Sequence, residues 1–115
     1  RNPSSAVSKK ERPETVPLTL YRRPSFKRSL RTLGAEGVEI VGRILEALEL
    51  YYGSNCSLEA ARKIAPRFFY KQLRKPYYEA GIESQIRVVL EREGEKVIAV
   101  LAGSHDDVKR FLKNI

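Results

Sequence analysis

The sequence predicts an α+β fold in which a helical hairpin packs on a mainly antiparallel four-stranded sheet, followed by a C-terminal helix. Apolar residues recur every three to four positions within 26–33 and 38–52, which is helical spacing. Short runs of strand-forming residues separated by turn residues then fill 77–102. Helical spacing returns after Gly103.

The N-terminal third has local signals of its own. Residues 1–16 carry Pro, Ser, Lys and Glu with almost nothing apolar, so we expect a disordered basic arm and a compact domain at 17–115. PLTLY at 17–21 is a short strand that needs partners in the main sheet, because a lone strand is unstable. Pro24 opens the first helix and Gly34 ends it.

The clearest helix is predicted at 35–52 and ends at Gly53. Ser57 is expected to cap a short helix that runs through Ile64, stopped by Pro66. The apolar stripe of the long helix is expected to contain Val38, Val41, Leu45, Leu48 and Tyr52.

Three strands are expected, at 77–83, 86–92 and 96–102. The short link at 93–95 makes an antiparallel hairpin the natural pairing of the last two. KVIAVLA at 96–102 is apolar enough to be buried on both faces of the sheet. Ser104 is expected to cap the last helix, with two aspartates in its first turn.

Composition narrows the class of protein. The 115 residues suffice for one domain, and the net charge is +8. Positive charge is concentrated in two regions, with nine Lys/Arg against two Glu in 1–34 and twelve against seven acids in 62–115. A basic body attracts a polyanion such as nucleic acid.

The numbers of cysteine and histidine residues further restrict the class of protein. The single Cys56 excludes an internal disulfide and favours a reducing, cytoplasmic location. One cysteine and one histidine argue against a zinc site, so we expect no metal and no cofactor. No apolar run is long enough to cross a bilayer, so we expect no membrane partner.

A basic segment interleaved with aromatic residues precedes the strands. RKIAPRFFYKQLRKPYY at 62–78 has six cations and no acid. Cations can position phosphates and aromatic rings can stack on unpaired bases. Alternatively the rings belong to the core, and we expect at least two of the five to do so. The candidate RNA-binding residues are Arg67, Lys71, Arg74, Lys75 and Tyr77.

Two further residues are candidates for catalysis. Arg87 interrupts an apolar strand, so it either pairs with a glutamate such as Glu83 or Glu91 or holds a scissile phosphate through its guanidinium. His105 is the only histidine and falls where a strand gives way to a helix. A neutral imidazole can pass a proton in either direction, although a histidine in this place can also be a surface or capping residue.

These motifs resemble the RelE/ParE toxin superfamily over roughly 17–115. IRVVLEREGEKVIAVLAG at 86–103 resembles the strand pair of RelE, and Lys71 with Leu73-Arg74 resembles the basic loop before that pair. GSHDD at 103–107 resembles the ending of the YafQ branch, whose histidine is catalytic. The resemblance therefore implies a RelE-like fold.

The resemblance also implies a function. It indicates the toxin of a toxin–antitoxin pair, held by a small acidic antitoxin, that cleaves messenger RNA on the ribosome. Cleavage would be a metal-independent attack of the 2′-hydroxyl on the adjacent phosphate, with Arg87 holding the phosphate and His105 moving a proton.

Four positions depart from the family pattern, among them Lys109, which replaces the terminal aromatic residue of the YafQ ending. Leu90 stands where many family nucleases have tyrosine, and Gly81 and Gln85 stand where the YafQ branch has a second histidine and an aspartate. Two alternatives therefore stay open. One is a ParE-like DNA gyrase inhibitor, and the other is an inactive RNA- or protein-binding module with the same fold.

Overall fold

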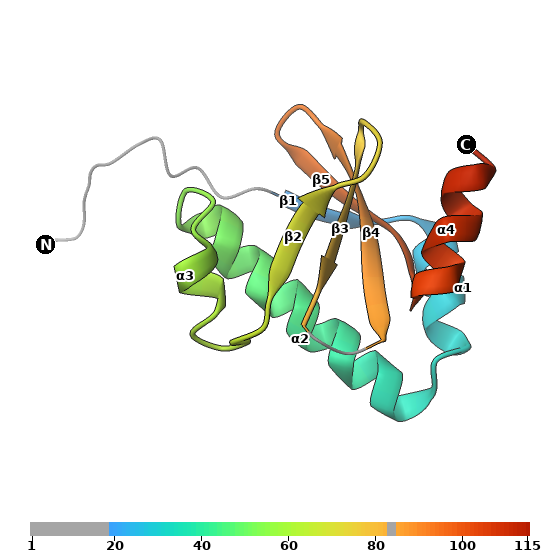
Figure 1. Ribbon diagram of the computed structural model, residues 1–115, viewed down its shortest axis with the longest axis horizontal. Helices are drawn as coiled ribbons and strands as arrows, with labels where there is room; N and C mark the ends of the chain where they lie inside the picture. The colour runs from blue at the N-terminus through green and yellow to red at the C-terminus, as the bar shows by residue number, and fades with distance from the viewer. Residues whose placement is uncertain (1–18, 83–84) are drawn as a thin grey trace, which may run out of the picture.

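The computed structural model describes residues 19–82 and 85–115. The predicted arm at 1–16 lies outside them, and so does Glu83. The elements, shown in Figure 1, are β1 (Thr19–Arg22), α1 (Pro24–Arg31), α2 (Gly34–Gly53), α3 (Leu58–Ala61), β2 (Phe69–Gln72), β3 (Tyr77–Gly81), β4 (Ile86–Glu93), β5 (Lys96–Ser104) and α4 (His105–Lys113).

The strands form one mixed sheet in the order β1-β5-β4-β3-β2, which confirms the α+β class. β1 pairs in parallel with β5, with Tyr21 opposite Ile98, so the N-terminal strand joins the main sheet as predicted. The sheet has five strands rather than four. The segment at 69–72, expected to be part of a basic loop, pairs antiparallel with β3 as an edge strand.

The sheet is covered differently on its two faces. On one face α1 and α2 bury Phe26, Ile44 and Leu48 against Leu90 and Ala99. On the opposite face, which we call the α4 face, a smaller cluster forms from Val89, Val100 and Val108, with Tyr77, Leu101 and Phe111 packed around it. The two central strands are therefore buried on both sides, as the apolar run in β5 predicted.

α1 continues the edge protection that β1 begins. β1 pairs with β5 only as far as Ala99, which leaves the rest of this edge of β5 without a strand neighbour. Ser25 Oγ donates to the carbonyl of Val100 at 2.7 Å, and Ser29 Oγ accepts from the backbone N–H of Ala102 at 3.0 Å. Because buried backbone groups need partners, these serines hold α1 tightly against β5.

The helices differ from expectation in two details. Val38 is 44% exposed, whereas Gly37 is buried. Gly37 packs so closely that an added Cβ would lie 2.6 Å from the Cβ of Leu33. The buried stripe of α2 therefore passes through Gly37 instead of Val38. Ser57 caps α3 as predicted, accepting from the backbone of Ala60 at 3.2 Å, but α3 is a single turn that ends before Ile64.

α4 begins with a capping box. Ser104 Oγ accepts from the backbone N–H of Asp107 at 3.2 Å, and an Asp107 carboxylate oxygen accepts from the backbone N–H of Ser104 at 2.9 Å. The second bond lowers the pKa of Asp107. This cap fixes the point at which β5 becomes α4, and with it the place of His105.

We predict that Asp107→Asn makes stability less sensitive to acid. Because the folded state lowers the pKa of Asp107, its contribution to the free energy of unfolding is present above the usual aspartate pKa of about 4 and is lost as the pH falls through the lowered value. Denaturant unfolding from neutral to acid pH should show the wild-type advantage shrinking. Asp106→Asn is the control, and a constant wild-type advantage down to acid pH would contradict the prediction.

Candidate active site and nucleic-acid interface

Three charged side chains meet on the α4 face across three neighbouring strands. Lys71 of β2 lies opposite Glu79 of β3 in the strand register, and Arg87 of β4 lies opposite Gly81 of β3. Side chains of directly paired residues point to the same face of a sheet. The sheet thus gathers Lys71 and Arg87, both predicted site residues, with an acid that the sequence analysis did not single out.

Glu79 is the centre of this group. Its side chain is 2% exposed, and it is the one buried charged residue in the part of the chain that the structure describes. Its Oε2 lies 3.0 Å from Arg87 Nε, and its Oε1 lies 3.9 Å from Lys71 Nζ. Since a buried carboxylate is costly unless it is paired, the arginine is part of what keeps Glu79 in the sheet.

Arg87 is held from another direction by an aromatic ring. Its guanidinium lies over Phe69, 5.0 Å from the ring centroid. The ring occupies the space above Gly81, where an added Cβ would come within 2.6 Å of it. Glycine at this position therefore lets Phe69 reach Arg87, and the place where the family resemblance puts a second histidine is covered by the Phe69 ring.

His105 lies at the same end of the sheet as Arg87. Arg87 is paired with Gly103 of β5, and His105 follows two residues later as the exposed first residue of α4. The strand register and the capping box together bring the two predicted catalytic residues to one end of the α4 face. Of the glutamates considered as partners for Arg87, Glu91 instead pairs with Arg23 at 2.8 Å.

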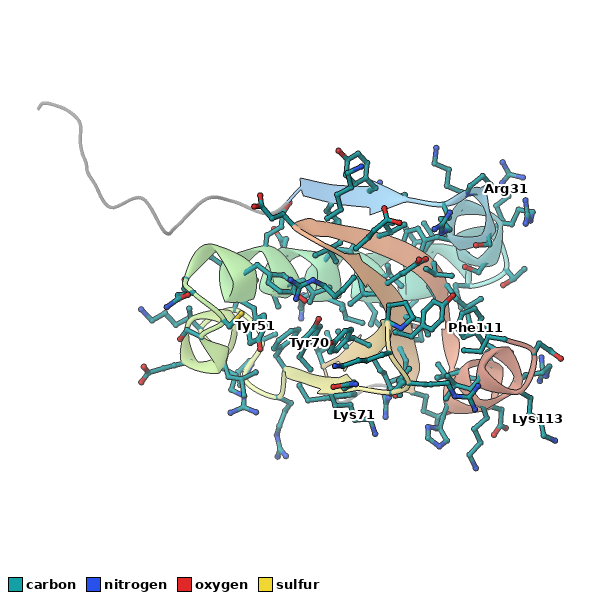
Figure 2. All side chains as sticks on the ribbon, turned by 90° about the horizontal axis from the view of Figure 1, so that it is seen from above. Arg31, Tyr51, Tyr70, Lys71, Phe111 and Lys113 are labelled. Atoms are coloured by element: carbon teal, nitrogen blue, oxygen red, sulfur yellow. The ribbon has the colours of Figure 1, made fainter. Side chains whose placement is uncertain are left out.

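A basic groove runs between α4 and the turn that joins β2 to β3. It has a volume of about 470 Å³. Cations from two elements gather there with a single acid, so the groove suits a phosphate backbone. Figure 2 shows Lys71 and Lys113 along the same side of the molecule. The groove is lined by Arg74, Asp106, Lys109, Arg110, Leu112 and Lys113.

The structure separates the other predicted RNA-binding residues. Tyr77 packs edge-on against Phe111 at 5.1 Å between ring centroids, so its ring anchors α4 to β3. Lys75 is exposed in the turn beside Arg74. Arg67 precedes β2 and lines a different hollow, of about 320 Å³, with residues that include Arg43. The predicted basic segment is therefore split between the two ends of β2.

An aromatic cluster holds the edge strand that carries Lys71. Tyr70 stacks on Tyr78 with the ring centroids 5.3 Å apart, and its hydroxyl hydrogen-bonds that of Tyr52 at the end of α2. Burial raises the pKa of both hydroxyls in this pair, so they stay protonated. Figure 2 shows Tyr51 and Tyr70 in this region. With Phe68 fully buried as well, at least two of the five aromatic residues belong to the core, as expected.

The groove cations on α4 and the acid on β3 were not among the site residues predicted from the sequence. The polar face of α4 repeats at 106, 109, 110 and 113, opposite the apolar residues that dock the helix, so helical spacing could have revealed it. Glu79 could have been noticed as the lone acid in an otherwise acid-free stretch of strand. Leu90, where many family nucleases have tyrosine, is fully buried against the helices.

Within 19–82 and 85–115, no three His, Cys, Asp or Glu side chains are grouped so that they could hold a metal ion.

Across the same residues, no helix has both the length and the apolar character needed to span a membrane.

Comparison with known proteins places the fold. No family model and no curated protein sequence matches the chain. Among solved structures, YafQ from Escherichia coli strain BL21(DE3) superposes with a TM-score of 0.57 at 10% identity, covering 79% of this chain and 97% of YafQ. The RelB–RelE antitoxin–toxin complex from Methanococcus jannaschii gives 0.55 at 15% identity, covering 79% and 96%.

A copper-bound mutant toxin from Helicobacter pylori gives a TM-score of 0.54 at 21% identity, covering 79% of this chain and 98% of that one. The chain therefore has the fold of the RelE and YafQ toxins. This agrees with the fold that the sequence motifs implied.

We predict that Arg87→Ala destabilises the protein by about 3 kcal/mol, because it leaves the buried Glu79 without its nearest partner. Adding Glu79→Gln should recover part of this loss, since the stranded charge is then gone. Denaturant unfolding of the two single variants and the double variant measures both effects. Additive losses would contradict a direct ion pair.

Proposed function

We propose that this protein is the toxin of a toxin–antitoxin pair and an endoribonuclease that cleaves messenger RNA. The observation that carries the proposal is the grouping of Arg87 and Lys71 around Glu79 on the α4 face, with His105 two residues beyond the β5 partner of Arg87. A groove lined by four cations and one acid lies along α4, the helix that His105 begins. The RelE and YafQ type of fold supports the same assignment.

The proposed reaction needs no metal. The 2′-hydroxyl of the substrate loses its proton and attacks the adjacent phosphorus, the bond to the 5′-oxygen breaks, and a 2′,3′-cyclic phosphate forms. Arg87 and Lys71 stabilise the charge that develops on the phosphoryl oxygens. His105 either accepts the proton from the 2′-hydroxyl as general base or donates a proton to the leaving 5′-oxygen as general acid.

The groove supplies the binding surface in this proposal. Arg74 from the β2–β3 turn and Lys109 and Lys113 from α4 hold the backbone on either side of the scissile bond. Arg110 is partly engaged by Asp107 at 3.2 Å, so it contributes less. The messenger RNA is taken on the ribosome, as the resemblance to RelE implies.

We also propose a small acidic antitoxin as the partner. Three of the similar structures are complexes with antitoxins, one of RelB–RelE and two of DinJ–YafQ. An acidic segment would complement the same groove cations and block RNA. α2, with the hollow lined by Arg43 and Arg67, offers a second docking surface. Co-purification from the native host tests this part, and consistent failure to recover a small acidic protein would count against it.

Two observations favour a second candidate, an RNA-binding module without catalysis. Glu79 neutralises much of the charge of Arg87, and Phe69 covers the space above Gly81 that a larger residue could use. Under this alternative the groove binds RNA and no cleavage follows. Incubating the protein with translating ribosomes and mapping RNA ends separates the two candidates.

We predict that His105→Ala lowers RNA cleavage by about 10²–10⁴-fold while the protein stays folded. The side chain is exposed at the start of α4, so its loss costs little packing. Cleavage rates and thermal unfolding of the same preparations provide the measurement, with Lys27→Ala on α1 as the control. Wild-type cleavage by folded His105→Ala protein would remove this residue from the mechanism.

We further predict that Arg74→Ala with Lys109→Ala flattens the salt dependence of RNA binding. Each lost phosphate contact on a single strand should reduce the log–log slope by about 0.7. Lys27→Ala with Arg31→Ala is the matched control, because it removes the same charge from α1, outside the groove. Equal slopes for both double variants would show that net charge alone governs binding.

A further inference from the structure

Glu79 has no part in the reaction proposed above, although it lies beside the residues that would bind phosphate. Its burial and its two cationic neighbours are established by the geometry of the α4 face. A carboxylate next to a phosphate site repels the substrate, and its burial costs solvation. A side chain with both disadvantages needs a compensating role.

The contacts of Glu79 indicate what that role is. Each carboxylate oxygen faces a different cation, Oε2 at 3.0 Å from Arg87 Nε and Oε1 at 3.9 Å from Lys71 Nζ. The carboxylate lies on the strand between the two strands that carry these cations. It therefore binds Arg87 at hydrogen-bond distance and attracts the more exposed Lys71 from the neighbouring strand.

Arg87 is constrained more tightly than an ordinary surface arginine. Glu79 binds its Nε, and the Phe69 ring lies against its guanidinium at 5.0 Å. The side chain is nevertheless 21% exposed, so part of the group reaches solvent. A guanidinium with restricted rotation loses less freedom when it binds an anion than a mobile one does.

We propose that Glu79 is a positioning residue, whose buried carboxylate holds Arg87 in a fixed orientation toward the substrate phosphate and attracts the exposed Lys71 to the same site. The identity of that phosphate rests on the function proposed above, whereas the holding of Arg87 by Glu79 does not. The three side chains keep a net charge of +1, which is enough to attract a phosphate.

A purely electrostatic role for Glu79 makes the opposite prediction. If the carboxylate only weakens the site, Glu79→Gln should tighten RNA binding and leave cleavage equal or faster. If Glu79 positions Arg87, the same change should lower kcat by about tenfold to 100-fold with little change in KM. That loss is smaller than the roughly 10²–10³-fold expected when a preorganised donor is removed altogether.

Glu79→Asp is the second variant, in case the uncharged side chain impairs folding. It keeps the charge but withdraws the carboxylate by one methylene from Arg87. Positioning requires a lower kcat for this variant too, whereas an electrostatic role requires wild-type behaviour. Glu91→Gln is the matched control, since Glu91 forms a comparable pair with Arg23 at 2.8 Å, is 17% exposed and lies outside the proposed site. It should cleave like wild type.

A second measurement, made without RNA, tests whether Glu79 holds the Arg87 side chain in place. In NMR spectra of ¹⁵N-labelled protein, the Nε–Hε group of Arg87 should give a shifted signal that exchanges slowly with water. Glu79→Gln and Glu79→Asp should shift that signal and speed its exchange, and Glu91→Gln should not. An unchanged Arg87 signal in the Glu79 variants would overturn the proposal, as would unchanged or faster cleavage.

The two measurements also separate this inference from the proposed function. If wild-type protein cleaves no RNA while the Arg87 signal depends on Glu79, the nuclease assignment fails and the positioning of Arg87 stands. If the protein cleaves RNA and Glu79→Gln does so at the wild-type rate, the nuclease assignment stands and Glu79 has no positioning role.

Discussion

The placement of the helices and of the candidate site depends on one constraint, the burial of β5 on both of its faces. α1 and α2 cover one face, α4 covers the other, and Ser25 and Ser29 of α1 take over the edge where β1 ends. α4 must therefore turn back onto the sheet directly after Ser104. That turn places His105 beside the strand end that carries Arg87, so the need to bury β5 also sets the geometry of the candidate site.

The α4 face also has to accommodate charge inside a sheet. Lys71 and Arg87 stand on strands that flank β3, and the buried carboxylate of Glu79 lies between them. Gly81 leaves room for the Phe69 ring over Arg87. The group is stable because the charges are paired, and it can act on an anion because Lys71 and part of Arg87 still reach solvent.

α4 contributes both to the packing of the sheet and to the lining of the basic groove. Its apolar side docks on the sheet through Val108 and Phe111, and Phe111 meets Tyr77 close to the β2–β3 turn. Its polar side faces Arg74 across the groove. A change that loosens the packed side would therefore also disperse the cations, which makes binding sensitive to the stability of one short helix.

Local signals were enough to predict most of the elements. The spacing of apolar residues predicted α1, α2, α4 and the strands β1, β3, β4 and β5. The capping roles of Ser57 and Ser104 were predicted as well, because those hydrogen bonds lie within a few residues of each serine. Features that depend on strand register and on how elements cross appeared only in the folded structure. The four residues of β2 carry no clear strand pattern, the partner of Arg87 follows from how β3 pairs with β4, and the groove requires α4 to cross near Arg74. Contacts between residues far apart in the chain leave no local signal, so the acid and the α4 cations became part of the site only in the folded molecule.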